Sequence, residues 1–166
     1  MVEVRIGAKN RTMPKHERSF INRSVRFGFL ERVAMTAVPT ILVIDDDPNI
    51  RGDLRMVLED EGSHVVTACD GQAGIEKAKE IRPNLVIVDM MMPRMSGFVV
   101  VERLKQHEQT PIPVFMLTAN ESDQQRAFAE FLGVDAYLNK PIGAKQLIEH
   151  VGRVCPRPEL SACAKT

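Results

Sequence analysis

The stretch "ILVIDDDPNI", Ile41 to Ile50, places four apolar residues directly before three carboxylates and a proline. The apolar run contains no alternating polar residues, which is typical of a strand covered on both faces, as in a parallel sheet between helices. Asp47 is suited to cap a helix, and Pro48 suits its first position, where the missing N–H is not needed. The stretch therefore predicts a buried strand, a short acidic turn and a helix.

The same strand-and-helix pattern recurs five times between residues 40 and 154. The apolar runs are "ILVI", "HVVTA", "NLVIV", "PVFML" and "DAYL". Helical periodicity is expected after Asp47 up to Gly62, from about Gly71 to Ile81, after Ser96, from about Glu121 to Leu132, and from Gly143 to about Val154. Five such units with short loops predict an α/β domain in which a five-stranded parallel sheet is flanked by five helices.

The charge is unevenly spread along the 166 residues, although the formal net charge is zero. Residues 1–39, which we call the basic arm, carry eight Lys and Arg against three Glu, so the remainder carries a net charge of −5. An acidic body argues against a nucleic-acid-binding domain. We expect the basic arm to be disordered, or weakly helical near Ser24 to Met35, and solvated rather than bound to nucleic acid or an acidic partner. Residues 155–166 are expected to form a flexible tail, and a start at Met35 would remove residues 1–34.

The cysteines and the apolar segments bear on the compartment. Cys69, Cys155 and Cys163 form no CxxC pair and no spacing typical of zinc. Their odd number and the lack of a secretory signal favour a reducing cytosol. No apolar run approaches the roughly 20 residues that cross a bilayer, so neither a membrane span nor a membrane partner is expected.

Polar side chains stand where four of the five predicted strands end. They are Asp45, Asp46 and Asp47 after the first strand, Asp89 after the third, Thr118 after the fourth, and Lys140 shortly after the fifth. Each one alone would more commonly be a helix cap or a surface charge. In an open parallel sheet, however, these ends share one edge, where ligands bind, and adjacent strands are only about 4.8 Å apart.

Clustered carboxylates at one edge repel one another unless something positive lies among them. Mg²⁺ suits this cluster, because it takes oxygen ligands and needs only one or two carboxylates beside its waters. Lys140 would add a fixed positive charge and Thr118 a hydroxyl donor. Together these groups suit a multiply charged phosphoryl group. The residues alone do not say which carboxylate would react with it.

Four motifs, "ILVIDDDPNIR", "NLVIVDMMMPRMSG", "FMLTA" and "YLNKPI", closely resemble in order and spacing the receiver domain of bacterial two-component response regulators. The resemblance covers about residues 40–154. It implies a flavodoxin-like (βα)5 fold with strand order 2-1-3-4-5. It also implies that Asp89 accepts a phosphoryl group from the phosphohistidine of a sensor histidine kinase. Asp45, Asp46 and Asp89 would bind Mg²⁺, with Asp46 as the direct ligand of the Asp45–Asp46 pair, and the Met91 backbone carbonyl would be a further ligand.

The resemblance assigns the remaining site residues to switching. Lys140 would pair with the phosphoryl oxygens, and Thr118 would bind one of them in the active state. Tyr137 matches an aromatic residue that turns inward when Thr118 moves, and Pro141 matches a proline preceded by a cis peptide bond. Met91 and Asn120 occupy positions that influence hydrolysis of the acyl phosphate. Because an apolar Met91 cannot orient water, we expect a lifetime longer than the shortest in the family.

The implied activity is that of a phosphoacceptor signalling domain rather than an enzyme, with self-catalysed phosphotransfer and autodephosphorylation. About a dozen residues follow Val154. We therefore expect a stand-alone receiver that binds an unidentified downstream protein and could dimerise on phosphorylation. An alternative is a phosphorelay intermediate that returns phosphate to another histidine. A distant alternative is a haloacid-dehalogenase-type phosphatase, which Asp45 and Asp47 resemble as a DxD pair, although its downstream acidic pair and cap insertion are not found.

Overall fold

The computed structural model describes residues 38–107, 112–119 and 122–156. Residues 1–37 of the basic arm lie outside the described residues, as does the tail from residue 157, which includes Cys163. Asn120 also lies outside them. Within the part described, no helix combines the length and apolarity that a membrane span requires.

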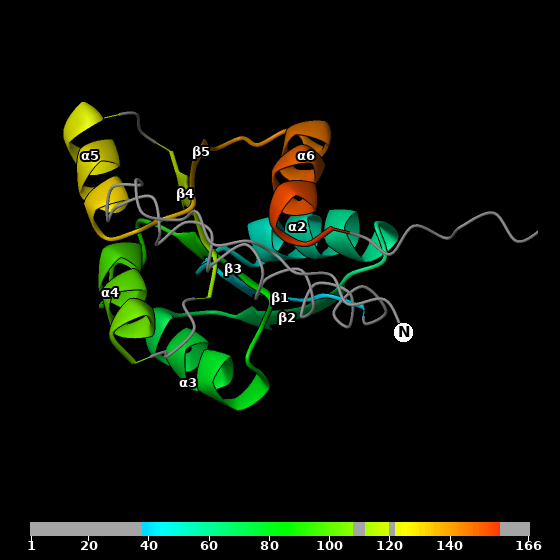
Figure 1. Ribbon diagram of the computed structural model, residues 1–166, viewed down its shortest axis with the longest axis horizontal. Helices are drawn as coiled ribbons and strands as arrows, with labels where there is room; N and C mark the ends of the chain where they lie inside the picture. Colours follow the sequence, from blue (N-terminus) through cyan, green and yellow to red (C-terminus); the bar gives the residue numbers. More distant parts are fainter. Residues whose placement is uncertain (1–37, 108–111, 120–121, 157–166) are drawn as a thin grey trace, which may run out of the picture. The chain divides into compact units, whose positions relative to one another are not determined.

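Strands and helices alternate along the described chain (Figure 1). The strands are β1 (Thr40–Ile44), β2 (His64–Ala68), β3 (Leu85–Asp89), β4 (Val114–Thr118) and β5 (Ala136–Asn139). The helices are α2 (Pro48–Asp60), α3 (Gly71–Ile81), α4 (Gly97–His107), α5 (Asp123–Phe131) and α6 (Ala144–Val154). All strand pairs are parallel and the sheet order is β2-β1-β3-β4-β5. The predicted fold class and strand order are confirmed.

Local signals set most of the helix boundaries. The Asp47 side chain accepts a hydrogen bond of 2.8 Å from the backbone N–H of Asn49 and so caps α2, as predicted. Gly62 and Gly133 follow α2 and α5 with φ of 81° and 79°, a region that glycine adopts without strain. The predicted start of α5 near residue 121 is wrong by two residues. Ser122 has an extended backbone, with φ −127° and ψ 126°, so the helix begins at Asp123.

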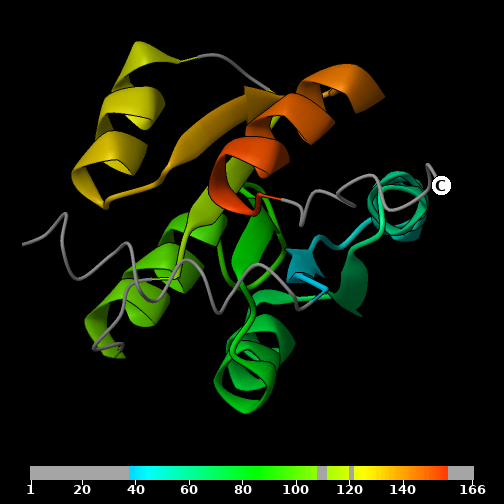
Figure 2. The same ribbon diagram turned by 45° about the vertical axis from the view of Figure 1, so that its right-hand side comes forward.

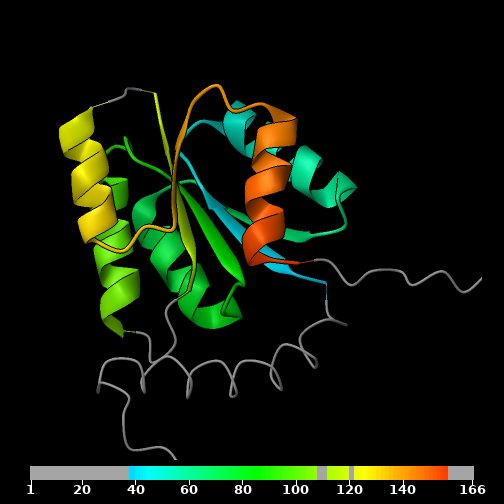
Figure 3. The same cartoon turned by 45° about the horizontal axis from the view of Figure 1, so that its top comes forward.

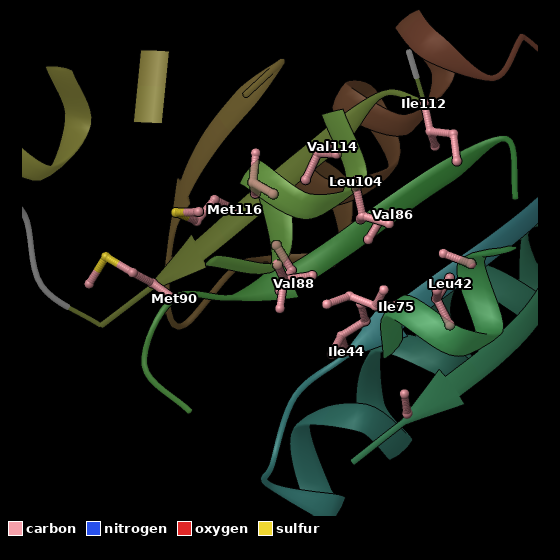
Figure 4. Packing of buried hydrophobic residues seen from close by; sticks show 14 of the residues in the cluster. Leu42, Ile44, Ile75, Val86, Val88, Met90, Leu104, Ile112, Val114 and Met116 are labelled. Atoms are coloured by element: carbon pink, nitrogen blue, oxygen red, sulfur yellow. The ribbon is translucent and has the colours of Figure 1, made fainter. Parts of the chain in front are cut away.

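Helices cover the sheet on both faces, with α3, α4 and α5 on one side and α2 and α6 on the other (Figures 1 and 3). Alternate residues of each central strand face the two layers. Leu42, Val86 and Met116 belong to the core under α3, α4 and α5 (Figure 4), whereas Ile41 and Phe115 belong to the core under α2 and α6. This double burial explains why the central strands are continuously apolar.

The strand register places the polar residues along one edge of the sheet. Ile44 of β1 lies opposite Val88 of β3, so the residues that follow each of them, Asp45 and Asp89, are neighbours. Backbone hydrogen bonds continue past the strand ends at this edge, from Met90 N–H to the Leu117 carbonyl and from Lys140 N–H to the Thr118 carbonyl. Strand β5, which leads to Lys140, runs between α5 and α6 (Figure 2).

Candidate functional site

Three carboxylates meet at the C-terminal edge of the sheet. Each of Asp45, Asp46 and Asp89 offers an oxygen that lies within 4.8 Å of the oxygens offered by the other two. Asp45 and Asp89 are 1% and 5% exposed, while Asp46 is open to solvent. The cluster is therefore a buried pair of acids with a third acid at its mouth.

A single ammonium group joins the two buried acids. Lys140 Nζ donates hydrogen bonds to Asp45 Oδ2 at 2.7 Å and to Asp89 Oδ1 at 2.6 Å. The lysine reaches them from beyond β5, because the backbone bond from its N–H to the Thr118 carbonyl holds its main chain against the end of β4. The peptide bond between Lys140 and Pro141 is cis, as expected.

Backbone N–H groups bind the second oxygen of each buried acid. Asp45 Oδ1 accepts a hydrogen bond of 2.9 Å from the N–H of Asp47, and Asp89 Oδ2 accepts one of 3.1 Å from the N–H of Met91. Each carboxylate is thus held by the lysine on one oxygen and by its own following loop on the other. This arrangement fixes both side chains before any ligand arrives.

The electrostatics of the cluster follow from burial and proximity. Burial raises the pKa of Asp45 above its ordinary value of 3.8, the charge of Asp89 adds to this rise, and the hydrogen bonds from Lys140 and Asp47 oppose it. For Lys140, burial acts to lower the pKa, but the two carboxylates outweigh it and the pKa is raised above 10.5. The lysine therefore stays charged at neutral pH and offsets only part of the negative charge.

The donor set fits a hard divalent cation. With Mg–O bonds of about 2.1 Å, two oxygens bound to the same ion lie at most about 4.2 Å apart, so oxygens that lie within 4.8 Å of one another need at most a small closure or a bridging water. Three carboxylates face one ammonium, so a cation would relieve the excess negative charge. Exposed Asp46 leaves that side open for water ligands. Asp45, Asp46 and Asp89 could therefore hold Mg²⁺, and the role of the Met91 carbonyl stays a prediction.

Two further residues support the site and were not predicted from the sequence. Arg51 Nη1 donates a 2.7 Å hydrogen bond to the backbone carbonyl of Asp45, which ties the acidic turn to α2. Gly97 donates its N–H to the Met90 carbonyl at 2.9 Å, and a Cβ at this position would overlap the Asp89 carbonyl oxygen. The glycine of the motif "MSG" was a usable signal for such a close approach. Nothing in the sequence distinguished Arg51 from a surface arginine.

The residues expected to switch lie on the two strands beyond Asp89. Thr118, at the end of β4, is fully buried. Tyr137 in β5 is half-buried, and its hydroxyl donates to the sulfur of Met90 at 3.6 Å. Arg126 of α5 lies over the Tyr137 ring, 5.2 Å from its centroid. Tyr137 therefore contacts both the residue that follows Asp89 and the neighbouring helix.

Known proteins share this sequence pattern and fold. The sequence profile described as "Response regulator receiver domain" matches residues 41–152. The chain is 34% identical over 122 residues to the alkaline phosphatase synthesis transcriptional regulatory protein PhoP of Bacillus subtilis, covering 74% of this chain and 50% of PhoP. It is 37% identical over 123 residues to the DNA-binding dual master transcriptional regulator RpaA of Synechocystis, covering 74% and 51%. The chain thus spans about half the length of these curated relatives.

Solved structures of response regulators have a similar fold. The chemotaxis protein CheY4 of Vibrio cholerae superposes with a TM-score of 0.67 at 32% identity, covering 71% of this chain and 99% of CheY4. A putative response regulator from Chloroflexus aurantiacus superposes with a TM-score of 0.68 at 28% identity, covering 73% of this chain and 100% of that protein.

Proposed function

Because the chain belongs to the response regulator receiver family, we propose that it accepts a phosphoryl group on Asp89 from the phosphohistidine of a sensor histidine kinase. The observation that carries this proposal is the bridge from Lys140 Nζ to Asp45 and Asp89, at 2.7 and 2.6 Å. It places a permanent positive charge against one oxygen of Asp89, beside a cluster of carboxylates that fits Mg²⁺.

The transfer reaction follows from these groups. A carboxylate oxygen of Asp89 attacks the phosphorus, the P–N bond to histidine breaks, and an acyl phosphate forms. Mg²⁺, held by Asp45 and Asp46, would offset the charge of the phosphoryl oxygens. The Lys140 ammonium, which pairs with the Asp89 carboxylate, would then also pair with an oxygen of the phosphoryl group. The Met91 N–H, which already donates to Asp89, orients the acceptor side chain.

The switching step uses the contacts around Tyr137. Phosphorylation adds negative charge beside Thr118 and Lys140 and attracts both side chains. The loop after Asp89 carries Met90, whose sulfur accepts the Tyr137 hydroxyl. A shift of this loop or of Thr118 therefore changes the packing of Tyr137 against α5. We propose that the surface of α5, β5 and α6 alternates between two states and binds a downstream protein in one of them.

Acetyl phosphate, a small phosphoryl donor, tests the acceptor directly. We expect intact-mass spectra to show a single phosphoryl adduct in the presence of Mg²⁺ and almost none in EDTA. Asp89→Asn should abolish the adduct. Asp70→Asn is a matched control, because Asp70 also follows a strand but caps α3 through the Ala73 N–H. Full labelling of Asp89→Asn would contradict the proposal.

A further inference from the structure

Three consecutive methionines follow Asp89, and they differ sharply in exposure. Met90 is 1% exposed and Met92 is 7% exposed, because both belong to the core under α3, α4 and α5. Met91 between them is 68% exposed. Buried and exposed side chains thus alternate after β3, which leaves one thioether in solvent at the edge that carries the acidic cluster.

Met91 is also tied to the acceptor carboxylate. Its N–H donates to Asp89 Oδ2 at 3.1 Å, so its position relative to that side chain is fixed by the backbone. The loop between β3 and α4 is closed by a backbone hydrogen bond of 2.9 Å from the N–H of Gly97 to the Met90 carbonyl. A chemical change at the Met91 sulfur would therefore occur on a residue whose backbone N–H is bonded to the acceptor side chain.

We propose that Met91 is a site of oxidation by peroxides and that its sulfoxide shortens the lifetime of the phosphoryl group on Asp89; this rests on the proposed function. A sulfur lone pair attacks the hydroxyl oxygen of the peroxide and the O–O bond breaks. The proton of that hydroxyl passes to the departing oxygen, which leaves as water or an alcohol. The sulfur is oxidised by two electrons and the peroxide is reduced by two. Sulfoxide reductases reverse such a change.

The sulfoxide adds a hydrogen-bond acceptor that can position water beside the acyl phosphate. A thioether is a weak hydrogen-bond acceptor, so the exposed Met91 side chain presents apolar surface to the solvent beside the Asp89 loop. A sulfoxide oxygen is a strong acceptor and can hold a water molecule near the phosphorus. Attack by that water breaks the P–O bond to Asp89 and releases inorganic phosphate, with the water protons passing to the phosphate and to solvent. Oxidation thereby makes the signal shorter.

The first test asks whether oxidation is selective. The full chain is treated with hydrogen peroxide and its peptides are analysed by mass spectrometry. Met91 should be oxidised much faster than Met90 or Met92. Met56 of α2, which is 59% exposed, provides an internal reference for an exposed methionine. Oxidation of Met92 at the same rate as Met91 would overturn the proposal.

The second test measures the half-life of the phosphoryl group, formed with acetyl phosphate, before and after peroxide treatment. Treated protein should lose the group about fivefold faster, the rate change that one ordinary hydrogen bond to the attacking water would produce. A methionine sulfoxide reductase should restore the untreated value. Met91→Leu should not respond to peroxide, whereas Met56→Leu should respond like the unmodified chain.

Substitutions at Met91 separate the effect of its sulfoxide from the effects of oxidation elsewhere in the chain. Met91→Gln carries a polar oxygen without oxidation, so its untreated half-life should already be short. An equal half-life before and after oxidation, or an equal response of Met91→Leu, would overturn the inference while leaving the proposed function intact. Failure of the untreated chain to take up phosphate would instead contradict the proposed function, and the inference with it.

Discussion

Replacing Lys140 by methionine should destabilise the protein strongly in the absence of divalent ions. The substitution keeps much of the side-chain volume but removes the ammonium that hydrogen-bonds two carboxylates at 2.7 and 2.6 Å. Asp45 and Asp89 would then repel each other in a site where their side chains are only 1% and 6% exposed. The folded state loses a favourable interaction and keeps two costly charges.

The magnitude follows from the burial of the cluster. Removing one partner of a buried ion pair costs about 3–5 kcal/mol. Lys140 is 16% exposed and Asp46 opens the cluster to water, so we expect the lower end, about 3 kcal/mol. For a domain of this size, a loss of that kind lowers the melting temperature by roughly 12 °C.

Urea unfolding followed by circular dichroism measures this loss on the full chain in EDTA at neutral pH. Arg55→Met is the control, because Arg55 is 54% exposed and pairs at 2.7 Å with Glu59, which is 42% exposed. An exposed pair of this kind contributes at most about 1 kcal/mol. Equal losses for the two variants, or no loss for Lys140→Met, would refute the electrostatic account of the cluster.

The pH dependence of the Lys140→Met deficit provides an independent check. Burial raises the pKa of Asp45 above 3.8, so the folded state holds this proton more tightly than the unfolded state. Without the lysine, which lowers the pKa of Asp45, the rise should be larger. A raised pKa gives stability that is present at low pH and is lost as the pH rises through the folded-state value. The deficit should therefore shrink on acidification, and a constant deficit would contradict this reasoning.

Three further experiments test the Mg²⁺ site, the close approach at Gly97 and the burial of Cys155. Mg²⁺ should raise the free energy of unfolding, by about 2.7 kcal/mol at one hundred times its dissociation constant, and Asp46→Asn should lose most of this gain in a titration followed by thermal melting. Gly97→Ala should destabilise the protein, because the added Cβ would overlap the Asp89 carbonyl oxygen. In Gly52→Ala, within α2, the added Cβ meets nothing within 4 Å. This control should raise the free energy of unfolding by about 0.5–1 kcal/mol in the same urea assay. Burial raises the pKa of the Cys155 thiol to about 11, so Cys155 should resist iodoacetamide at pH 8 until urea unfolds the chain, and rapid native-state alkylation would contradict its burial.

The fold was predictable because strands buried on both faces of the sheet are continuously apolar in the sequence. Short continuous apolar runs such as Ile41–Ile44, each followed by a helical segment, are typical of strands in a sheet covered on both faces. The cap at Asp47 was equally visible, since the proline after it marks the first helical turn. The start of α5 was misjudged, although Ser122 is a common N-cap residue and Asp123 suits the first turn of a helix.

The site was predictable as a set of residues but not as a set of contacts. Parallel strands place their carboxyl ends at one edge, so the grouping of the acids with Lys140 followed from the order of the motifs. The bond from Arg51 to the Asp45 carbonyl depends on the path of a side chain across a turn, which no spacing encodes. The contact between Tyr137 and Met90 likewise joins residues 47 positions apart whose packing only the folded sheet determines.

Chemical trapping of the acyl phosphate identifies the aspartate that carries the phosphoryl group. Borohydride reduces an aspartyl phosphate to homoserine, which leaves a permanent mark that peptide mass spectrometry can locate. After incubation of the full chain with acetyl phosphate and Mg²⁺, we expect homoserine at residue 89 and at no other aspartate. Homoserine at residue 45 or 46, or its appearance at residue 89 without any phosphoryl donor, would contradict the assignment of Asp89 as the phosphoryl acceptor.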